Sequence, residues 1–427
     1  MLDWRKLYCG RSILEQRWRE PEGEPRVLRI DGHKDRCVSE SLLLLYETAL
    51  VTPCDLWDVV FGSVLIFLIS SSVYCLDFDS SRIVTGSRDR TIKVWCIKTG
   101  RCMATFEGHS GSVLCLKFER DWDLGSEGVS HGFMVSGSSD CTVCVWDLIS
   151  TPITPGERSS IGDRPGKSKD GHPTAAAGSF GPPRKITAEI RKVLRGHSAG
   201  VLDLRMDERW IVTCSKDALM NVYDRKTLTL HTVLRGHEGP VNAVGLENGR
   251  VVSASGDGKM MLWDVETGKC VRVFEGHEKG LACIEFKARD DLILSGSNDC
   301  TIKLWRASTG ECLHTFAGHT LLVRALCFEP KTGYIVSTSY DKSVRVWEWR
   351  EGPVDDGAQS QAGGSSEGSV QRKTKGVGRL VREFRNLHAS HIFDVKFDVG
   401  KIVSTSHDQK IVVLDFSYGI EGAELFS

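Results

Sequence analysis

Short runs of β-branched and aromatic residues, separated by turns rich in Gly, Asp, Asn and Ser, recur along most of the chain. In the segment VVSASGDGKMMLWD (Val251–Asp264), two such runs flank a Gly-Asp-Gly turn, which is a strong signal for a β-hairpin. The pattern repeats: in seven places an Asp is followed six residues later by the residue that ends a strand. These pairs are Asp89–Trp95, Asp140–Trp146, Asp217–Tyr223, Asp257–Trp263, Asp299–Trp305, Asp341–Trp347 and Asp408–Leu414.

A dipeptide that ends in His recurs with the same period as these Asp pairs. Leu-His at His388 precedes the last Asp pair, and Gly-His precedes the other six, at His33, His109, His197, His237, His277 and His319. A unit of roughly 40 residues that runs from Gly-His through Asp to Trp-Asp is the signature of a four-stranded propeller blade. One blade cannot bury both faces of its sheet, so blades stack and close a ring. The pattern predicts an all-β fold: a seven-bladed WD-repeat β-propeller.

The repeated His and Asp residues are predicted to be structural. In each unit the Asp, the imidazole and a strand hydroxyl such as that of Ser253 can link to the Trp indole, which satisfies these polar groups within one blade. Seven copies at one position indicate a scaffold rather than a catalytic pair. Elsewhere the sequence shows no phosphate-binding glycine loop or nucleophile elbow, so we expect no enzyme and no cofactor. We expect Cys141 and Cys144 on opposite faces of a strand, without a metal.

The two ends of the chain are predicted to pair. The third strand of blade seven, IVVLDF (Ile411–Phe416), is followed by few residues, and the missing outer strand is found in RVLRI (Arg26–Ile30). Apolar residues upstream, among them Leu14 and Trp18, follow helical spacing and predict an amphipathic helix. The expected organisation is a helix within residues 1–20 and a propeller over 26–420.

Three insertions interrupt the repeats, at residues 36–71, 151–183 and 352–378. The last two are rich in Gly, Ser and other small or polar residues and are expected to be disordered peripheral loops. The end of the first insertion begins an uncharged run, Val59–Leu76, whose 18 residues continue past the insertion and reach the lower limit for a membrane span. The end of this run, SVYCL, is however predicted as the innermost strand of blade one. Three explanations of residues 36–71 remain open: a membrane span, a genuine loop insertion, and an artefact of gene modelling such as translated intron sequence. We favour the artefact and expect no interaction with a membrane.

Composition adds little about partners. The chain has 427 residues and a formal net charge of −1, which gives no global indication of nucleic acid or an acidic membrane. Its fifteen cysteines, with no signal peptide in MLDWRKLYCGRS, predict reduced thiols. We expect the protein in the cytoplasm and nucleus.

The ring resembles the beta-TrCP-like group of F-box/WD-repeat proteins, the substrate receptors of cullin-RING (SCF) ubiquitin ligases. The resemblance is carried by GSVLCLKFE, IVTCSKD, VVSASGD, KGLACIEF and the ending IVSTSHDQKIVVLDF. The leading WRKLYCGRSILEQRW is similar to the end of the linker helices that join the F-box to the propeller in that group. The F-box itself should precede this helix by about forty residues and is missing from the sequence, so a Skp-type adaptor and a cullin are expected as partners only if an F-box lies upstream.

The resemblance also implies a ligand and a site. Family members bind doubly phosphorylated Asp-Ser-Gly degrons at the mouth of the channel, so phosphorylated protein substrates are expected here. Lys279 and His391 stand where the family pattern has Arg. The positions that fall on or beside the family's contacts are Tyr74, Arg88, Ser112, Leu114, Ser139, Leu202, Asn242, Lys279, Gly280, Ala282, Arg324, Tyr340 and His391. The alternative function is a stand-alone WD-repeat scaffold in another multiprotein complex.

Overall fold

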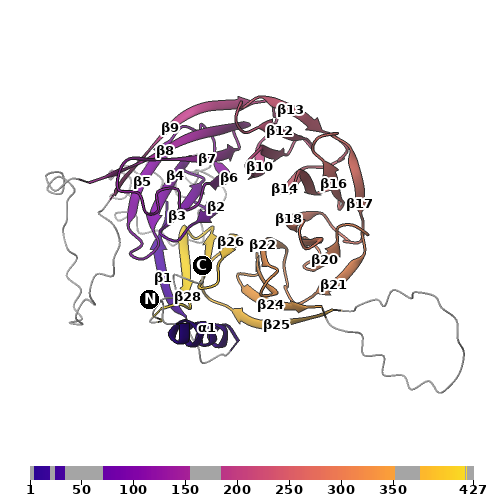
Figure 1. Ribbon diagram of the computed structural model, residues 1–427. Helices are drawn as coiled ribbons and strands as arrows, with labels where there is room; N and C mark the ends of the chain where they lie inside the picture. The colour runs from indigo at the N-terminus through magenta and orange to yellow at the C-terminus, as the bar shows by residue number, and fades with distance from the viewer. Residues whose placement is uncertain are drawn as a thin grey trace, which may run out of the picture.

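The seven repeats form seven four-stranded antiparallel sheets around a ring (Figure 1). The computed structural model describes residues 4–19, 25–33, 71–153, 184–351, 376–418 and 420. The predicted fold class, a seven-bladed β-propeller with a short N-terminal helix, is confirmed. Most of the three insertions predicted at 36–71, 151–183 and 352–378 lies outside the described residues, and so does Val59–Ser70 of the apolar run.

The strands of blades one to four follow one another along the chain. Their bounds are β2 (Val73–Phe78), β3 (Arg82–Ser87), β4 (Thr91–Cys96) and β5 (Cys102–Glu107); β6 (Val113–Phe118), β7 (Ser130–Ser138), β8 (Thr142–Pro152) and β9 (Arg184–Arg195); β10 (Val201–Met206), β11 (Trp210–Ser215), β12 (Met220–Asp224) and β13 (Leu230–Leu234); β14 (Val241–Glu247), β15 (Arg250–Ser255), β16 (Met260–Asp264) and β17 (Cys270–Phe274).

Blades five and six have the same order, and blade seven takes its fourth strand from the start of the chain. The bounds are β18 (Leu281–Lys287), β19 (Leu292–Ser297), β20 (Ile302–Arg306) and β21 (Cys312–Phe316); β22 (Val323–Glu329), β23 (Tyr334–Ser339), β24 (Val344–Arg350) and β25 (Val377–Phe384); β26 (Ile392–Phe397), β27 (Lys401–Ser406), β28 (Lys410–Asp415) and β1 (Arg26–Asp31).

Several boundaries differ from the sequence-based expectation. Thr151 and Pro152 end β8, and Gly378 lies in β25, although all three were predicted to be loop residues. The β8–β9 hairpin is therefore longer than its counterparts. Cys141 is not on a strand: it lies in the turn before β8 with a positive φ of 67°. The predicted innermost strand in SVYCL is confirmed as part of β2.

Ring closure follows the predicted pairing of the two ends. β1 is antiparallel to β28, and Arg26 to Asp31 pair with Asp415 to Lys410 in unbroken register. Ile30, opposite Ile411, is 3% exposed and packs with the side chains between blades seven and one. Because β1 completes the outer edge of blade seven, residues nearly 400 positions apart close the ring.

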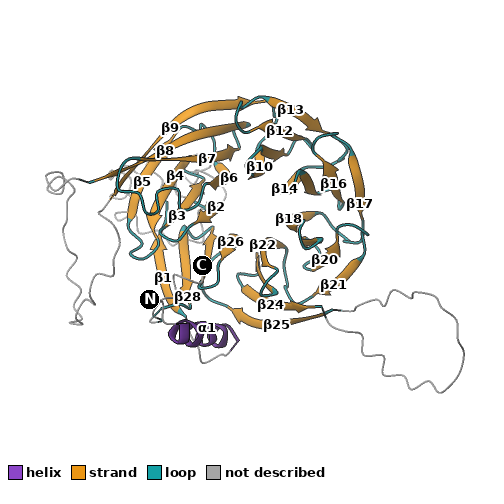
Figure 2. Cartoon of the chain, viewed as in Figure 1, coloured by secondary structure: helices purple, strands orange, loops and turns teal. Residues whose placement is uncertain are grey.

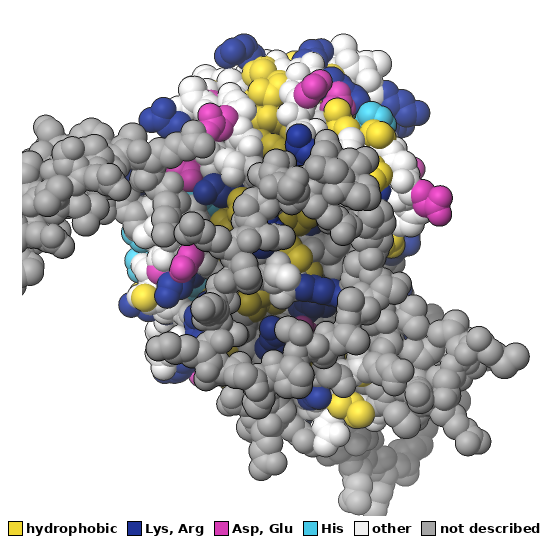
Figure 3. Space-filling view, turned by 90° about the vertical axis from the view of Figure 1, so that its left-hand side faces the viewer, with side chains coloured by type: hydrophobic (Ala, Val, Ile, Leu, Met, Phe, Trp, Pro, Cys, Tyr) yellow, Lys and Arg dark blue, Asp and Glu magenta, His cyan; other side chains and the backbone are white. Residues whose placement is uncertain are grey.

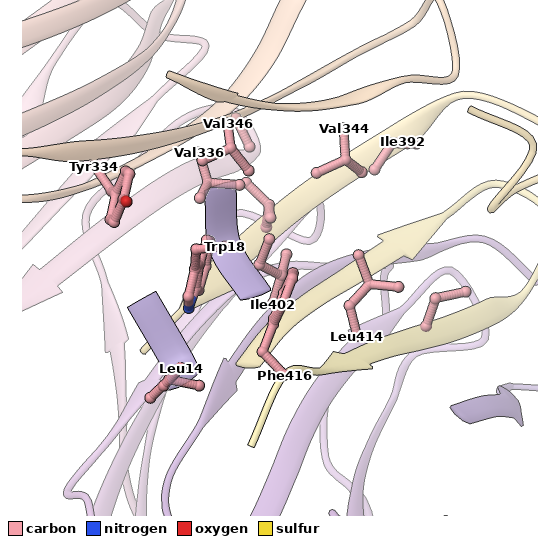
Figure 4. Packing of buried hydrophobic residues seen from close by; sticks show 13 residues of the cluster. Leu14, Trp18, Tyr334, Val336, Val344, Val346, Ile392, Ile402, Leu414 and Phe416 are labelled. Atoms are coloured by element: carbon pink, nitrogen blue, oxygen red, sulfur yellow. The ribbon is translucent and has the colours of Figure 1, made fainter. Parts of the chain in front are cut away.

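The helix α1 (Trp4–Arg19) lies against the outside of blades six and seven (Figure 2). The Trp18 ring is stacked between Phe416, at a centroid distance of 4.4 Å, and Tyr334, at 5.5 Å (Figure 4). Its indole nitrogen donates to the carbonyl of Val399 at 2.8 Å, and the side chain of Leu14 is also buried. The helix therefore joins blade six to blade seven beside the closing strand.

The predicted polar network is present in the blades. In blade four, His237 Nδ1 lies 2.8 Å from an Asp257 oxygen, and Nε2 lies 2.7 Å from Ser253 Oγ, which also accepts from Trp263 Nε1 at 2.9 Å. His–Asp contacts of 2.7 to 3.2 Å occur in all seven blades. Blades three and seven have Tyr223 and Leu414 in place of Trp. In these two blades the strand hydroxyl therefore accepts no hydrogen bond from an indole N–H.

The network fixes the protonation of its members. Burial lowers the pKa of His33, His109 and His277, and this effect outweighs the opposing effect of the paired carboxylates. A neutral imidazole donates from Nδ1 to the Asp and accepts the hydroxyl proton at Nε2. Burial opposes ionisation of Asp299, but hydrogen bonds from Thr301 and His277 outweigh it and lower the pKa of Asp299 to about 2.

We expect ring closure to depend on the buried face of β1. Ile30→Ala should lower the free energy of unfolding by about 2–5 kcal/mol, because it opens a cavity between blades seven and one. Val27 lies in the same strand but is 39% exposed, so Val27→Ala should cost less than about 1 kcal/mol. Urea denaturation measures both variants. Equal losses would show that closure does not depend on this packing.

We also expect stability to fall on mild acidification. Because the native pKa of the three histidines is lowered, the unfolded chain binds more protons just below its histidine pKa of about 6.5, and stability falls as pH decreases through that value. The lowered carboxylate pKa values add a further loss below about pH 4. Denaturation at pH 7.5, 6.5 and 5.5 measures the slope. His277→Gln should reduce the slope, and a flat profile in the wild-type chain would contradict the assignment.

Candidate functional site

The seven innermost strands surround a central channel (Figure 1). Where each inner strand pairs with the next strand of its blade, the register shifts at its second residue. A β-bulge of this kind leaves one residue out of the ladder and redirects its side chain. The seven bulge residues all line the channel, and we call them the bulge ring: Tyr74, Leu114, Leu202, Asn242, Ala282, Arg324 and Phe393.

A second ring lies at the same end of the channel. The residue before each repeated Asp donates its backbone N–H to a carbonyl just upstream of the inner strand, as Arg88 does to Ser72 at 2.9 Å and His407 to His391 at 3.0 Å. This bond holds the turn over the start of the inner strand. We call these residues the turn ring, and both rings together the mouth: Arg88, Ser139, Lys216, Gly256, Asn298, Tyr340 and His407.

One sector of the mouth is aromatic. Tyr340 and His391 are stacked, with centroids 4.5 Å apart and planes 8° from parallel. Phe393 contacts Tyr74 at 5.1 Å and Tyr340 at 5.9 Å, and it lies 6.2 Å from His407. Blades six, seven and one therefore present one continuous aromatic cluster.

The fourteen residues of the two rings include Arg88, Lys216 and Arg324 but no carboxylate. Arg88 and Arg324 are half-buried, and Arg324 Nη1 lies 3.5 Å from the carbonyl of Ala282. The repeated Asp residues that follow the turn ring are already occupied, since each accepts hydrogen bonds from its histidine and from backbone N–H groups. Asp257, for example, accepts from Glu238 N and Lys259 N. The mouth is therefore basic beside its aromatic sector.

Deeper in the channel the charges are paired. Lys117 Nζ lies 3.2 Å from Asp77, and Arg120 lies 3.0 Å from the same carboxylate. Burial opposes ionisation of Asp77, but these two cations outweigh it and lower its pKa to about 2. Lys287 and Glu285 form a similar pair at 3.1 Å. Because each of these cations has a carboxylate partner, this section offers an anion fewer unpaired cations than the mouth does.

The structure places the thirteen predicted site residues around one opening. Six of them belong to the bulge ring and three to the turn ring. The remaining four, Ser112, Lys279, Gly280 and His391, immediately precede inner strands. Sequence reasoning selected His391 in blade seven but missed Phe393, which is the bulge residue there. Aligning all seven repeats on the inner strand would have found it.

Two further observations concern the described part of the chain. Within it, no helix is long and apolar enough to cross a membrane. Among the same residues, no group of three or more His, Cys, Asp or Glu side chains is placed to hold a metal ion.

The repeats match a known family model, "WD domain, G-beta repeat", over residues 63–96, 100–147, 188–224, 228–264, 268–306 and 310–348, which is more than half of the chain. The chain belongs to the WD40 repeat family. Members of this family are in general non-enzymatic scaffolds that bind protein partners. The matched segments end before blade seven, whose strands come from both ends of the chain.

Individual relatives are distant. The chain is 24% identical over 244 residues to the WD repeat-containing protein pop1 of Schizosaccharomyces pombe, covering 52% of this chain and 30% of that protein. It is 30% identical over 111 residues to the F-box/WD repeat-containing protein 7 of Drosophila melanogaster, covering 26% and 6%. The chain thus spans less than half of the length of the curated relatives that it matches. The WD40 propeller of Doa1 superposes with a TM-score of 0.57 at 19% identity, covering 83% of this chain and 95% of that one, which shows the fold alone.

Proposed function

We propose that this WD40 propeller is a substrate receptor for phosphorylated proteins and acts in an SCF-type ubiquitin ligase that directs them to degradation. The observation that carries the proposal is the mouth: Arg88 and Arg324 flank an aromatic sector, and neither ring contains a carboxylate. The cytoplasm and nucleus are the compartments we propose for this role.

A phosphorylated peptide matches this chemistry. A phosphate ester carries a charge of about −1.5 to −2 at neutral pH and three acceptor oxygens. Arginine binds such oxygens through two donors at once, and partial burial strengthens the contact by removing water. Aromatic rings beside the cations provide a surface on which the peptide backbone and apolar side chains can pack. Specificity for phosphate over an uncharged hydroxyl follows from the half-buried arginines.

The ligase assignment has two further supports. The resemblance to F-box/WD-repeat receptors includes the helix before the ring, and an F-box/WD relative is among the matched proteins. In addition, Trp18 fixes the end of α1 between two blades, so this end of the helix has a defined position relative to the ring. The Skp-type adaptor and cullin remain partners only for a chain that carries an F-box upstream. Affinity purification with the natural N-terminus should recover both; their absence would favour the stand-alone scaffold.

We expect Arg88→Ala and Arg324→Ala each to weaken binding of a doubly phosphorylated Asp-Ser-Gly peptide by tenfold or more. Loss of one partner of a desolvated charge pair costs on the order of 2–5 kcal/mol. Lys279→Arg should strengthen binding, because it restores a forked donor. Isothermal titration with phosphorylated and unphosphorylated peptides measures these effects.

The matched control is Arg289→Ala. Arg289 has a side chain that is 82% exposed and follows β18 at the end far from the mouth, so its loss should leave peptide affinity unchanged. Thermal unfolding of each variant separates lost binding from lost structure. Equal affinity of the wild-type chain for the two peptides would exclude phosphate recognition at the mouth and support the scaffold alternative.

A further inference from the structure

A cluster of arginines lies at the other end of blade six from the mouth. It surrounds Glu348, which pairs in register with Tyr334 at the start of β23, whereas Tyr340 of the turn ring follows the end of that strand. We call Arg19, Arg350 and Arg379 the arginine cluster. Arg19 comes from α1, and the other two come from β24 and β25.

The three arginines share one buried carboxylate. Arg350 donates from Nε and Nη2 to Glu348 Oε1 at 3.0 and 2.6 Å, and Arg379 donates from the same two atoms to Oε2 at 2.8 and 2.6 Å. Arg19 Nη2 lies 3.7 Å from Oε1, while its Nε donates to the Tyr334 hydroxyl at 3.1 Å. Burial opposes ionisation of Glu348, but the hydrogen bonds from Arg379 and Arg350 outweigh it and lower its pKa.

The cluster is held in place but not neutralised. Glu348 is 2% exposed, whereas the side chains of Arg19, Arg350 and Arg379 are 44%, 64% and 63% exposed. Three guanidinium groups and one carboxylate leave an excess of two positive charges. Within the described residues, the Nη1 atoms of Arg350 and Arg379 make no hydrogen bond, and both side chains are largely exposed.

We propose that the arginine cluster is a second anion-binding site, which takes a phosphorylated serine or threonine in a segment of a partner protein. A phosphate ester carries nearly the two negative charges that the cluster lacks, and its oxygens suit guanidinium donors fixed in advance by Glu348. The site is separate from the mouth and does not depend on the proposed function of the mouth.

Charge distribution favours a single phosphate ester over a nucleic acid. Nucleic-acid binding needs a basic stripe that follows many phosphates. In sequence Glu20 follows Arg19 and Glu351 follows Arg350, and Glu15 and Glu351 pair with Arg11 and Arg306. Figure 3 draws another side of the ring, where basic, acidic and hydrophobic side chains of the described residues are interspersed. The three arginines are fixed around one carboxylate, which makes a compact site rather than a stripe of separate cations.

The test uses the full-length chain with Arg88→Ala and Arg324→Ala, so that the mouth contributes little. The probes are a fluorescein-labelled Gly-Ser peptide with one phosphoserine, the same peptide without phosphate, and an RNA oligonucleotide of equal length. Fluorescence anisotropy at low and moderate salt measures affinity, because exposed charges are screened by ions. We expect the phosphopeptide to bind best of the three, with an affinity that falls as salt rises.

Substitutions then locate the site. Arg350→Gln combined with Arg379→Gln should weaken phosphopeptide binding at least tenfold, and Arg289→Gln should not change it. Arg350→Lys keeps the charge and the pairing with Glu348, so it should fold and bind with an intermediate loss if the forked geometry matters. Unchanged binding in both cluster variants, equal binding of the unphosphorylated peptide, or tighter binding of RNA would each overturn the proposal.

Discussion

The closing pair β1–β28 is the constraint on which the rest of the structure depends. Six residues of β1 pair in unbroken register with β28, and Ile30 is buried between the last blade and the first. A propeller blade is stable only against its neighbours, so a gap at this seam would expose the faces of two blades. The stacking of Trp18 on Phe416 places α1 beside the same seam, and the N-terminal segment thereby secures the ring twice.

Within the closed ring, backbone and side chains have separate roles. The His–Asp contacts and the bulge recur in all seven blades, so the backbone presents the same two positions seven times. Only the side chain at each position changes, from Ala282 through Asn242 to Arg324. Recognition by this propeller is consequently decided by which blade carries which residue. The aromatic cluster arises because Tyr74, Tyr340 and Phe393 occur on three successive blades.

Sequence reasoning succeeded where the signal is repeated and failed where it is local. The period of Gly-His and Asp identified the blades, and the missing outer strand identified β1, because each inference was supported by seven comparable units. The bulge has no residue signature of its own: Tyr74, Leu114 and Ala282 share nothing but position, and so Phe393 was missed. The end of β8 was misplaced for a related reason. Pro152 is a residue that usually interrupts strands, yet it closes β8 at the last rung of pairing with β9, where its missing N–H is tolerated.

The two basic regions lie at opposite ends of blade six and differ in how their cations are held. Arg324 occupies a bulge and is fixed mainly by the backbone around it, so its contribution to binding can be removed without loss of an ion pair. Arg350 and Arg379 are fixed by Glu348, which ties any ligand there to the α1–blade six seam through Arg19. A ligand at the mouth would lie at the other end of blade six from that seam, whereas an anion at the arginine cluster would contact the arginines that Glu348 holds in place. An anion at the cluster would therefore lie beside Arg19 of α1, and a ligand at the mouth would not.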